Sequence, residues 1–187
     1  MSTVETITPR QEHWDRLPNK QAITRTIEAL KNRGINTELV DSPREALRLI
    51  TTKIPDGAQI MTGASTTLDE IGFTELQATG AEYFIGSIQA IAETGEVVVV
   101  SASGSQIPAY AFNARNIVWV VGTQKIVPSL EEALRRVREH ALPLESARMK
   151  TQGFPGSIIG KILILEREVP QLGRNLTMIL VNEKLGF

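Results

Sequence analysis

One glutamate of the chain lies in an apolar stretch, where a charged side chain is unusual. Residues 90–100 read AIAETGEVVVV, so Glu93 stands between small apolar residues and four consecutive valines. A buried carboxylate is unfavourable unless it is paired, hydrogen-bonded or neutral. With Thr94 and Gly95 it forms a turn at the end of a buried strand, where it could act as a general base or covalent nucleophile. The same residues fit a glutamate that accepts backbone N–H bonds and organises the turn, and both roles stay open.

A second polar turn, Gly63-Ala64-Ser65-Thr66-Thr67, leaves a predicted strand and opens a predicted helix. Its backbone N–H groups, hydroxyls and helix dipole could converge on a phosphate or a carboxylate. The alternative is that Ser65 to Thr67 only cap the helix. Both interpretations can hold together, because a cap leaves other donors free.

A third polar turn, SASGSQ at residues 101–106, follows the valine strand and predicts a wall of hydroxyl and amide groups that includes Ser103 and Gly104. Ser103 or Ser105 as a nucleophile is disfavoured. The chain has no Gly-x-Ser-x-Gly elbow, and neither His13 nor His140 has a sequence context that marks it as an activating base. A serine hydrolase is therefore not predicted.

A fourth turn, GTQK, follows the apolar run IVWVV and carries Lys125 out of a strand. This lysine could pair with an anionic ligand or with Glu93, and the alternative is a solvated loop lysine. Arg115, Arg148 and Arg174 are further candidates for binding an anion, although nothing local separates them from packing or surface arginines.

The elements that must position these turns alternate between strands and helices. Helices are predicted for Asn19 to Arg33, from Ser42 to about Lys53, within residues 64–72, and from Ser129 to about His140, on helical spacing and N-capping signals. Short apolar runs rich in β-branched residues predict strands at residues 35–40, 58–63, 81–86, 96–100, 116–122, 161–166 and 176–181.

This order predicts an α/β fold with a mainly parallel, twisted sheet flanked by helices on both faces. In such sheets ligands bind beyond the carboxyl ends of the strands, so the turns that leave the strands are the places to search for a site. We expect an N-terminal arm at residues 1–18 and a single domain at residues 19–187, because no linker or repeat divides the rest.

Composition excludes several functional classes. The net charge of −1, without a basic tract, argues against nucleic acid as a partner. No apolar run reaches the length of about 20 residues that spans a bilayer, and the first residues do not resemble a signal peptide, so a cytoplasmic protein is predicted. The absence of cysteine excludes a cofactor held by cysteine, and the two histidines show no metal-ligand spacing.

Four segments resemble the lactate utilization domain (LUD) family. They are MTGASTTLDEIGF, IGSIQAIAETGEVVVVSASGSQIPA, NIVWVVGTQKIVPSLEEALRRVREHALPLESAR and the terminal MILVNEKLGF. The order and spacing of the Glu-Thr-Gly motif and the GTQKIV block are more specific than either alone. The resemblance implies a fold similar to coenzyme A transferases, ribose-5-phosphate isomerases and glucosamine-6-phosphate deaminases.

The resemblance also implies roles for the polar turns. It favours Gly63, Ser65, Thr66 and Thr67 as an anion-binding turn, and Glu93-Thr94-Gly95 looks like the Glu-Asn-Gly-like turn whose glutamate accepts the acyl group in coenzyme A transferases. Lys125 is then the charge partner.

The predicted function is a component of L-lactate or other organic-acid oxidation that binds a small anionic metabolite. The ligand would carry an acyl or phosphate group, as in a coenzyme A thioester or a phosphorylated metabolite. The expected partners are iron–sulfur oxidoreductase proteins and a second copy of the chain. The alternatives are a stand-alone enzyme of the coenzyme A transferase or sugar-phosphate isomerase type, and a non-catalytic assembly or regulatory subunit.

Overall fold

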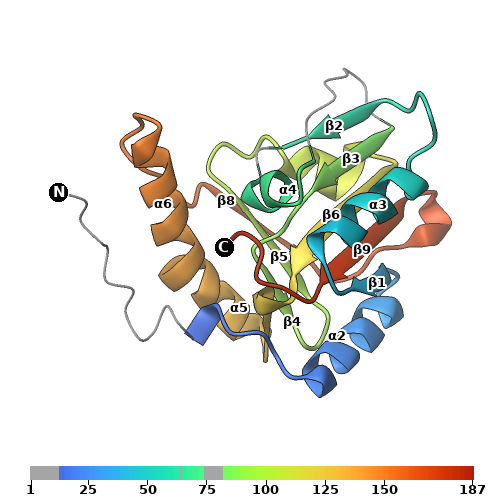
Figure 1. Cartoon of the computed structure of the whole chain (residues 1–187), viewed down its shortest axis with the longest axis horizontal. Coiled ribbons are helices and arrows are strands. Elements are labelled where there is room, and N and C mark those ends of the chain that lie inside the picture. Colours follow the sequence, from blue (N-terminus) through green and yellow to red (C-terminus); the bar gives the residue numbers. More distant parts are fainter. Residues whose placement is uncertain (1–12, 64, 74–81) are drawn as a thin grey trace.

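Two β-sheets form the centre of the protein, whose computed structural model describes residues 13–63, 65–73 and 82–187. In the first sheet all neighbouring strands run parallel. Its order is β1 (Asn36–Val40), β9 (Asn175–Val181), β6 (Asn116–Gly122), β3 (Tyr83–Gly86) and β2 (Ile60–Thr62). The predicted α/β architecture with a mainly parallel sheet is therefore confirmed (Figure 1).

The second sheet is smaller and mixed. Its order is β7 (Ile126–Val127), β4 (Ala90–Ala92), β5 (Val97–Ser101) and β8 (Lys161–Leu165). β4 runs parallel to β7 and antiparallel to β5, and β5 runs antiparallel to β8. The runs at residues 96–100 and 161–166 were expected to be strands, and they are, but they belong to this separate sheet.

The helices follow the predicted capping signals. Asn19, Ser42, Ser65 and Ser129 are the N-caps, and each accepts a backbone N–H with its side chain. The α-helices are α2 (Lys20–Asn32), α3 (Pro43–Lys53), α4 (Thr66–Glu70), α5 (Leu130–Arg136) and α6 (Leu142–Thr151). A π-helical turn, η3 (Val137–Ala141), joins α5 to α6, and the shorter pieces are η1 (Ala109–Asn113), η2 (Thr123–Lys125) and η4 (Pro170–Leu172). The helix expected to end near His140 thus continues through η3 into α6 and ends at Thr151, and Pro143 lies in the first turn of α6.

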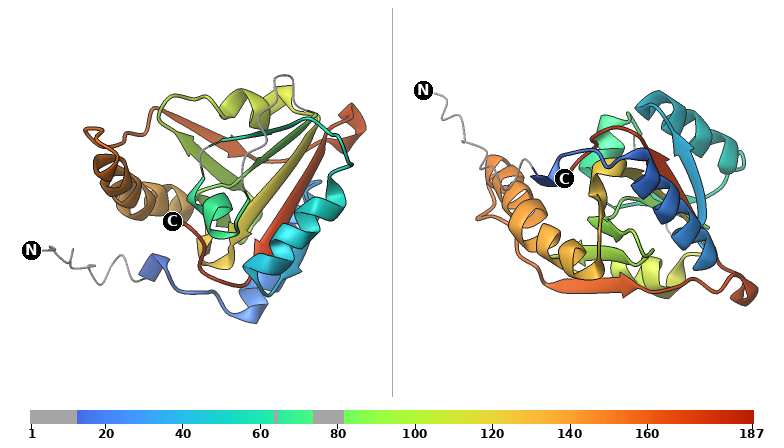
Figure 2. Two further views of the ribbon diagram at one scale, coloured as in Figure 1. Left: turned by 45° about the horizontal axis from the view of Figure 1, so that its top comes forward. Right: turned by 90° about the horizontal axis from the view of Figure 1, so that it is seen from below.

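Alternate residues of β6 divide the interior into two cores. Val118 and Val120 pack with α3 and α4, whereas Trp119 and Val121 pack with α2 and with the second sheet. Because successive side chains of a strand point to opposite faces, α3 and α4 cover one face of the parallel sheet and α2 and the second sheet cover the other. Figure 2 shows these layers.

A third core lies on the other face of the second sheet. Ala90, Val98 and Val127 from that sheet pack there with Ala133 and Val137. Trp14 also belongs to this core and is 3% exposed. The described end of the expected N-terminal arm is therefore packed on the domain, and residues 1–12 lie outside the described residues.

No helix within the described ranges has the combination of length and apolar character needed to cross a bilayer.

Candidate functional site

A cavity of about 410 Å³ lies at one edge of the parallel sheet. Three of its wall segments follow the carboxyl ends of β2, β3 and β6, which are neighbours in that sheet. These segments carry Ser65 to Thr67, Ser87 to Gln89, and Lys125. The cavity therefore occupies the edge at which ligands bind in open α/β sheets.

The rest of the cavity is built by the second sheet, by η3 and by α6 with the segment that follows it. The polar turn after β5 contributes Ser101, Ser103 and Ser105. An apolar wall comes from η3, α6 and the segment after α6, with Val137, Leu142, Met149, Ile158 and Ile159. A cavity with one polar and one apolar side suits a small amphipathic metabolite.

The structure brings together half of the residues that the sequence predicted for a site. Ser65, Thr66, Thr67, Ser103 and Lys125 line the cavity. Gly63 and Gly104 do not line it but support it. A Cβ on Gly63 would lie 2.6 Å from the side chain of Gln106, which lines the cavity, and Gly104 donates its N–H to Ser101 at 2.9 Å. Glu93, Thr94 and Gly95 form a turn outside the cavity wall.

The turn before α4 caps the helix and also lines the cavity, while its role in binding an anion stays a prediction. The Ser65 hydroxyl accepts the N–H of Leu68 at 3.4 Å and so caps the helix, while the same residue lines the cavity. Thr67 is 2% exposed and its hydroxyl lies 3.4 Å from the Leu185 carbonyl oxygen. The five residues of α4 form little more than one turn, so a ligand here would rely on side chains more than on the helix dipole.

Lys125 is the buried cation of the cavity. It ends the 3₁₀ turn η2 directly after β6 and is 2% exposed. Its Nζ donates to Thr67 Oγ1 at 3.1 Å, to Ser87 Oγ at 3.2 Å and to the Ile88 carbonyl at 3.1 Å. Burial lowers the pKa of Lys125 to about 7, with help from the Arg136 cation and against the opposing effect of Glu70. Near neutral pH the neutral form of this amine is therefore far more populated than that of an exposed lysine.

Three side chains bind the connection from β3 to β4, and each donates a hydrogen bond to a different backbone carbonyl. Tyr110 donates its hydroxyl to the Ser87 carbonyl at 3.3 Å, and Arg136 donates to the Gln89 carbonyl at 2.6 Å. Lys125 binds the carbonyl between them, that of Ile88. Because this connection leaves the parallel sheet and enters the second sheet, the three bonds fix the two sheets relative to each other at the cavity floor.

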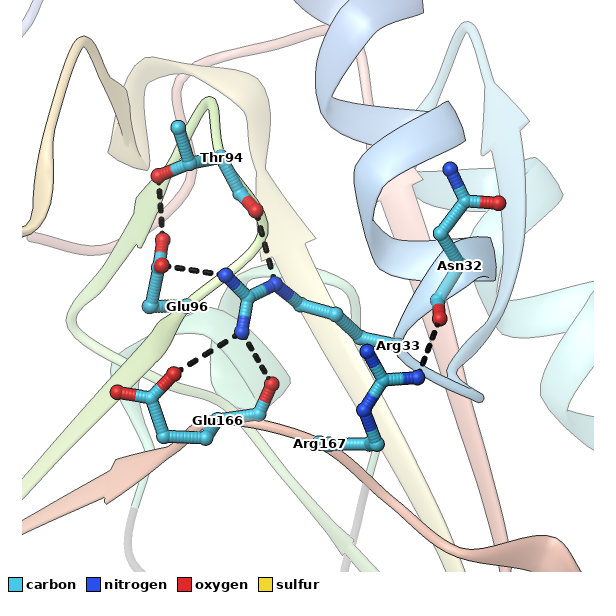
Figure 3. A network of polar contacts seen from close by, with 6 residues as sticks. All are labelled: Asn32, Arg33, Thr94, Glu96, Glu166 and Arg167. Carbon is cyan, nitrogen blue, oxygen red and sulfur yellow. Dashed lines mark hydrogen bonds and ion pairs between the residues drawn. The ribbon is translucent and has the colours of Figure 1, made fainter.

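The Glu-Thr-Gly turn is tied to α2 by two arginines. Arg25 binds Oε2 of Glu93 through Nε at 3.0 Å and through its terminal nitrogen at 2.6 Å. Arg33 donates Nε to the Thr94 carbonyl at 2.8 Å and also binds the Glu96 carboxylate, as Figure 3 shows. The Glu93 side chain is 21% exposed, so its carboxylate lies at the surface of this turn.

The same Arg33 guanidinium reaches the far end of β8. It binds the carbonyl and the carboxylate of Glu166, the latter at 3.0 Å (Figure 3). Gly95 has φ +97°, and a Cβ there would lie 2.7 Å from Cδ of Arg33. The glycine of the motif therefore has a structural reason: it supplies the left-handed turn and the space that the arginine fills.

Several cavity residues were not singled out by the sequence, and three of the polar ones are Ser87, Glu145 and Gln89. Ser87 follows β3, and Glu145 lies on the helical segment that had been expected to end at His140. Glu145 binds Arg148 with two bonds, of 2.7 and 2.8 Å. The third, Gln89, accepts the N–H of Val100 at 2.7 Å. The rule that ligands bind after the carboxyl ends of parallel strands could have found Ser87, because it directly follows the run YFIG.

Among the described residues, no group of three or more histidine, aspartate or glutamate side chains is placed to hold a metal ion.

An α/β protein with a cavity at the carboxyl edge of a parallel sheet is the class that this fold and site define. Residues 73–159 match the family model described as LUD domain, which confirms the predicted resemblance to the LUD family. That range includes Ser87, Glu93 and Lys125 and leaves out the turn before α4.

A solved structure agrees at the level of the fold. The chain resembles a DUF162 family protein from Deinococcus radiodurans with a TM-score of 0.60 and 12% sequence identity, over 89% of this chain and 100% of that one. A search of curated proteins found no match.

Proposed function

We propose that this LUD-domain protein binds a small metabolite with an anionic, acyl or phosphate group in the cavity that Lys125 lines, as part of cytoplasmic organic-acid metabolism such as L-lactate oxidation. The observation that carries the proposal is the buried Lys125 amine, which meets two hydroxyls and a carbonyl at the cavity wall. Among the described residues, no carboxylate is in hydrogen-bond contact with this amine, so it gains most from a ligand that brings negative charge.

The dimensions and lining of the cavity support a metabolite of modest size. About 410 Å³ is within the range of small-molecule pockets, and the apolar side formed by α6 and the following segment can take a hydrocarbon part. A coenzyme A thioester would place only its acyl end here, and a phosphorylated metabolite would place its phosphate beside Lys125.

The proposal includes partner proteins. Oxidation of lactate transfers electrons, and this cysteine-free chain has no thiolates with which to hold an iron–sulfur cluster. We therefore propose that an iron–sulfur oxidoreductase acts beside it, with a homodimer as the working assembly.

The alternative of a stand-alone enzyme is favoured by one observation. Burial holds the pKa of Lys125 at about 7, which suits an acid–base group at neutral pH. Coenzyme A transferase and sugar-phosphate isomerase chemistry both need such a group, and the chemical class of the ligand would separate them.

The test is a thermal-shift and calorimetry screen with L-lactate, pyruvate, acetyl-coenzyme A and ribose 5-phosphate. A ligand at about 100 times its dissociation constant stabilises a protein by roughly 2.7 kcal/mol, which is readily measured. We expect Lys125→Met and Ser65→Ala to weaken binding, and Lys31→Met, an exposed lysine on α2, to leave it unchanged. Binding by the wild type that neither cavity variant weakens would contradict the proposed site.

A further inference from the structure

Three cavity residues form a closed triangle of hydroxyl and amine groups. Ser87 Oγ lies 3.2 Å from Lys125 Nζ and 3.2 Å from Thr67 Oγ1, and Lys125 Nζ lies 3.1 Å from Thr67 Oγ1. All three residues line the cavity. They come from the ends of three neighbouring parallel strands, so the sheet itself sets their spacing.

A serine hydroxyl beside a neutral lysine amine is a nucleophile with its base. The hydroxyl is a weak nucleophile at its own pKa and becomes effective when an adjacent group takes its proton. Lysine serves as that base in serine–lysine enzymes. The sequence had given no reason to expect a serine nucleophile, because neither histidine had the context of a base, and the structure supplies a lysine instead.

The other ionisable side chains that line the cavity are engaged. Glu145 and Arg148 bind each other with two hydrogen bonds on α6. His140 is fully buried and lies beside Asp15, with 3.1 Å between Nε2 and Oδ1, and it is absent from the cavity wall. Within the described cavity, Lys125 is therefore the base that Ser87 can reach.

The backbone around Ser87 holds the pair in place. Tyr110 binds the Ser87 carbonyl, and burial raises the pKa of its hydroxyl, so the hydroxyl stays protonated and continues to donate. Arg136 holds the Gln89 carbonyl, and Lys125 itself binds the Ile88 carbonyl between them. A catalytic serine and its base need such fixed geometry, because small displacements cost large factors in rate.

We propose that Ser87 is a catalytic nucleophile and Lys125 its general base, and that the cavity accepts the acyl group of an ester or thioester. This inference rests on the proposed function only in taking the cavity as the binding site. The apolar wall with Met149, Ile158 and Ile159 would hold the hydrocarbon part of a short acyl chain.

The step balances in atoms and protons. Ser87 Oγ forms a bond to the acyl carbon while the neutral Lys125 amine takes the hydroxyl proton. The bond from the acyl carbon to the leaving oxygen or sulfur breaks, and the Lys125 ammonium returns the proton to that atom. Water or another acceptor with an O–H or S–H group then attacks acyl-Ser87, and its proton follows the reverse route through Lys125.

The experiment measures acylation with p-nitrophenyl acetate and p-nitrophenyl butyrate. We expect a burst of p-nitrophenol of about one equivalent per chain, and peptide mass spectrometry that places the acyl group on Ser87. Removing a positioned base or nucleophile lowers rates by about 100-fold or more. Ser87→Ala and Lys125→Met should show that loss, whereas Thr51→Ala and Lys31→Met, on the exposed faces of α3 and α2, should react as the wild type does.

Further readouts keep the test independent of folding. Ser87→Cys should retain a burst, because a thiol is a competent nucleophile, and thermal unfolding of each variant reports its stability. The acylation rate should rise with pH through about 7 as Lys125, which faces Arg136 and Glu70, loses its proton. An adduct on a lysine, or an unchanged burst in folded Ser87→Ala, would overturn the inference.

The two proposals fail in different ways. Suppose that Lys125→Met weakens metabolite binding and that neither ester acylates Ser87. This result would contradict the role of Ser87 as a nucleophile and would still support the binding site. If Ser87 is acylated but no metabolite in the screen binds, the nucleophile is supported and the proposed metabolite site is contradicted.

Discussion

Arg25 holds the carboxylate of Glu93 through two nitrogens, at 2.6 and 3.0 Å, across 68 residues of sequence. The Arg25 side chain is 56% exposed and that of Glu93 is 21% exposed, so the pair lies at the protein surface. A surface ion pair contributes little, and its loss is expected to leave the cavity intact. The pairing therefore supports the turn-organising interpretation of Glu93, and the catalytic interpretation stays a prediction.

Glu93→Gln separates the two interpretations. If the carboxylate organises the turn, the variant should lose about 0.5 to 1 kcal/mol of unfolding free energy, and ligand binding in the cavity should not change. Arg25→Gln should lose a similar amount, with little further loss in the double variant. Denaturant unfolding and calorimetry measure both quantities. Loss of turnover in a Glu93→Gln protein of unchanged stability would instead assign catalysis to Glu93.

Arg33 is expected to matter far more to stability than Arg25. Arg33→Met removes the cationic partner of the Glu96 carboxylate and one donor from each of two carbonyls, and the expected loss is about 2 to 4 kcal/mol of unfolding free energy. Arg44→Met, an exposed arginine on α3, should stay within about 0.5 kcal/mol of the wild type. Equal effects of the two substitutions in urea unfolding would show that the Arg33 contacts contribute nothing.

The same contacts predict that the free energy of unfolding falls at acidic pH. Burial raises the pKa of Glu96, but hydrogen bonds from Thr94 and from its own backbone, together with the charge and hydrogen bond of Arg33, outweigh this and hold it below the ordinary value of 4.5. The contribution of Glu96 is therefore complete above about pH 4.5 and is lost as the pH falls through the folded pKa. Unfolding curves between pH 3 and 6 should show a smaller loss in Arg33→Met than in the wild type.

Gly95→Ala tests the close approach of Arg33 to the turn. Gly95 (φ +97°) would place a Cβ 2.7 Å from the arginine side chain and 3.0 Å from the Ala29 carbonyl carbon. Gly57 has φ +79° with nothing within 4 Å, so Gly57→Ala carries the backbone strain alone, about 1 to 2 kcal/mol. We expect Gly95→Ala to lose about 3 kcal/mol or more in thermal or denaturant unfolding. If both variants lose the same unfolding free energy, the close contact with Arg33 at Gly95 does not destabilise the Gly95→Ala protein.

The lowered pKa of Lys125 predicts that the free energy of unfolding rises with pH. Its pKa is about 7 in the folded protein and near 10.5 in the unfolded chain, so between these values the unfolded state binds more protons. Each pH unit in that window adds at most roughly 1.4 kcal/mol of unfolding free energy. Urea unfolding at pH 7 to 9.5 should show this slope in the wild type and a flatter one in Lys125→Met. Parallel curves would mean that the buried amine keeps its ordinary pKa.

Local signals explain how much of the fold the sequence predicted. The caps at Ser42, Ser65 and Ser129 depend on residues within one turn, and the central strands β6 and β9 are largely apolar runs, so both can be recognised without tertiary information. β4 could not, because its three residues, Ala90–Ala92, are too few to show a period. α6 was missed because Pro143 suggests an end, whereas proline fits the first turn of a helix.

The site residues also divide into those that a local sequence pattern identifies and those that only the fold brings together. Ser65, Thr67 and Lys125 were found because each belongs to a polar turn after an apolar run. Which of these turns meet in space depends on strand order, and β3 and β6 are neighbours although β4 and β5 lie between them in sequence. The partners of Glu93 depend on the packing of α2, 60 or more residues away, and no local pattern encodes such a contact.

The position of β9 in the parallel sheet has a consequence for how the protein is made. β9 lies between β1 and β6, and it pairs with β1 along all five residues of that strand. During synthesis β1 must therefore wait for a neighbour that is translated about 140 residues later, while its backbone hydrogen-bonding groups lack their native partners. Such long-range pairing slows folding and leaves nascent chains prone to association, so chaperone dependence should concentrate on this interval.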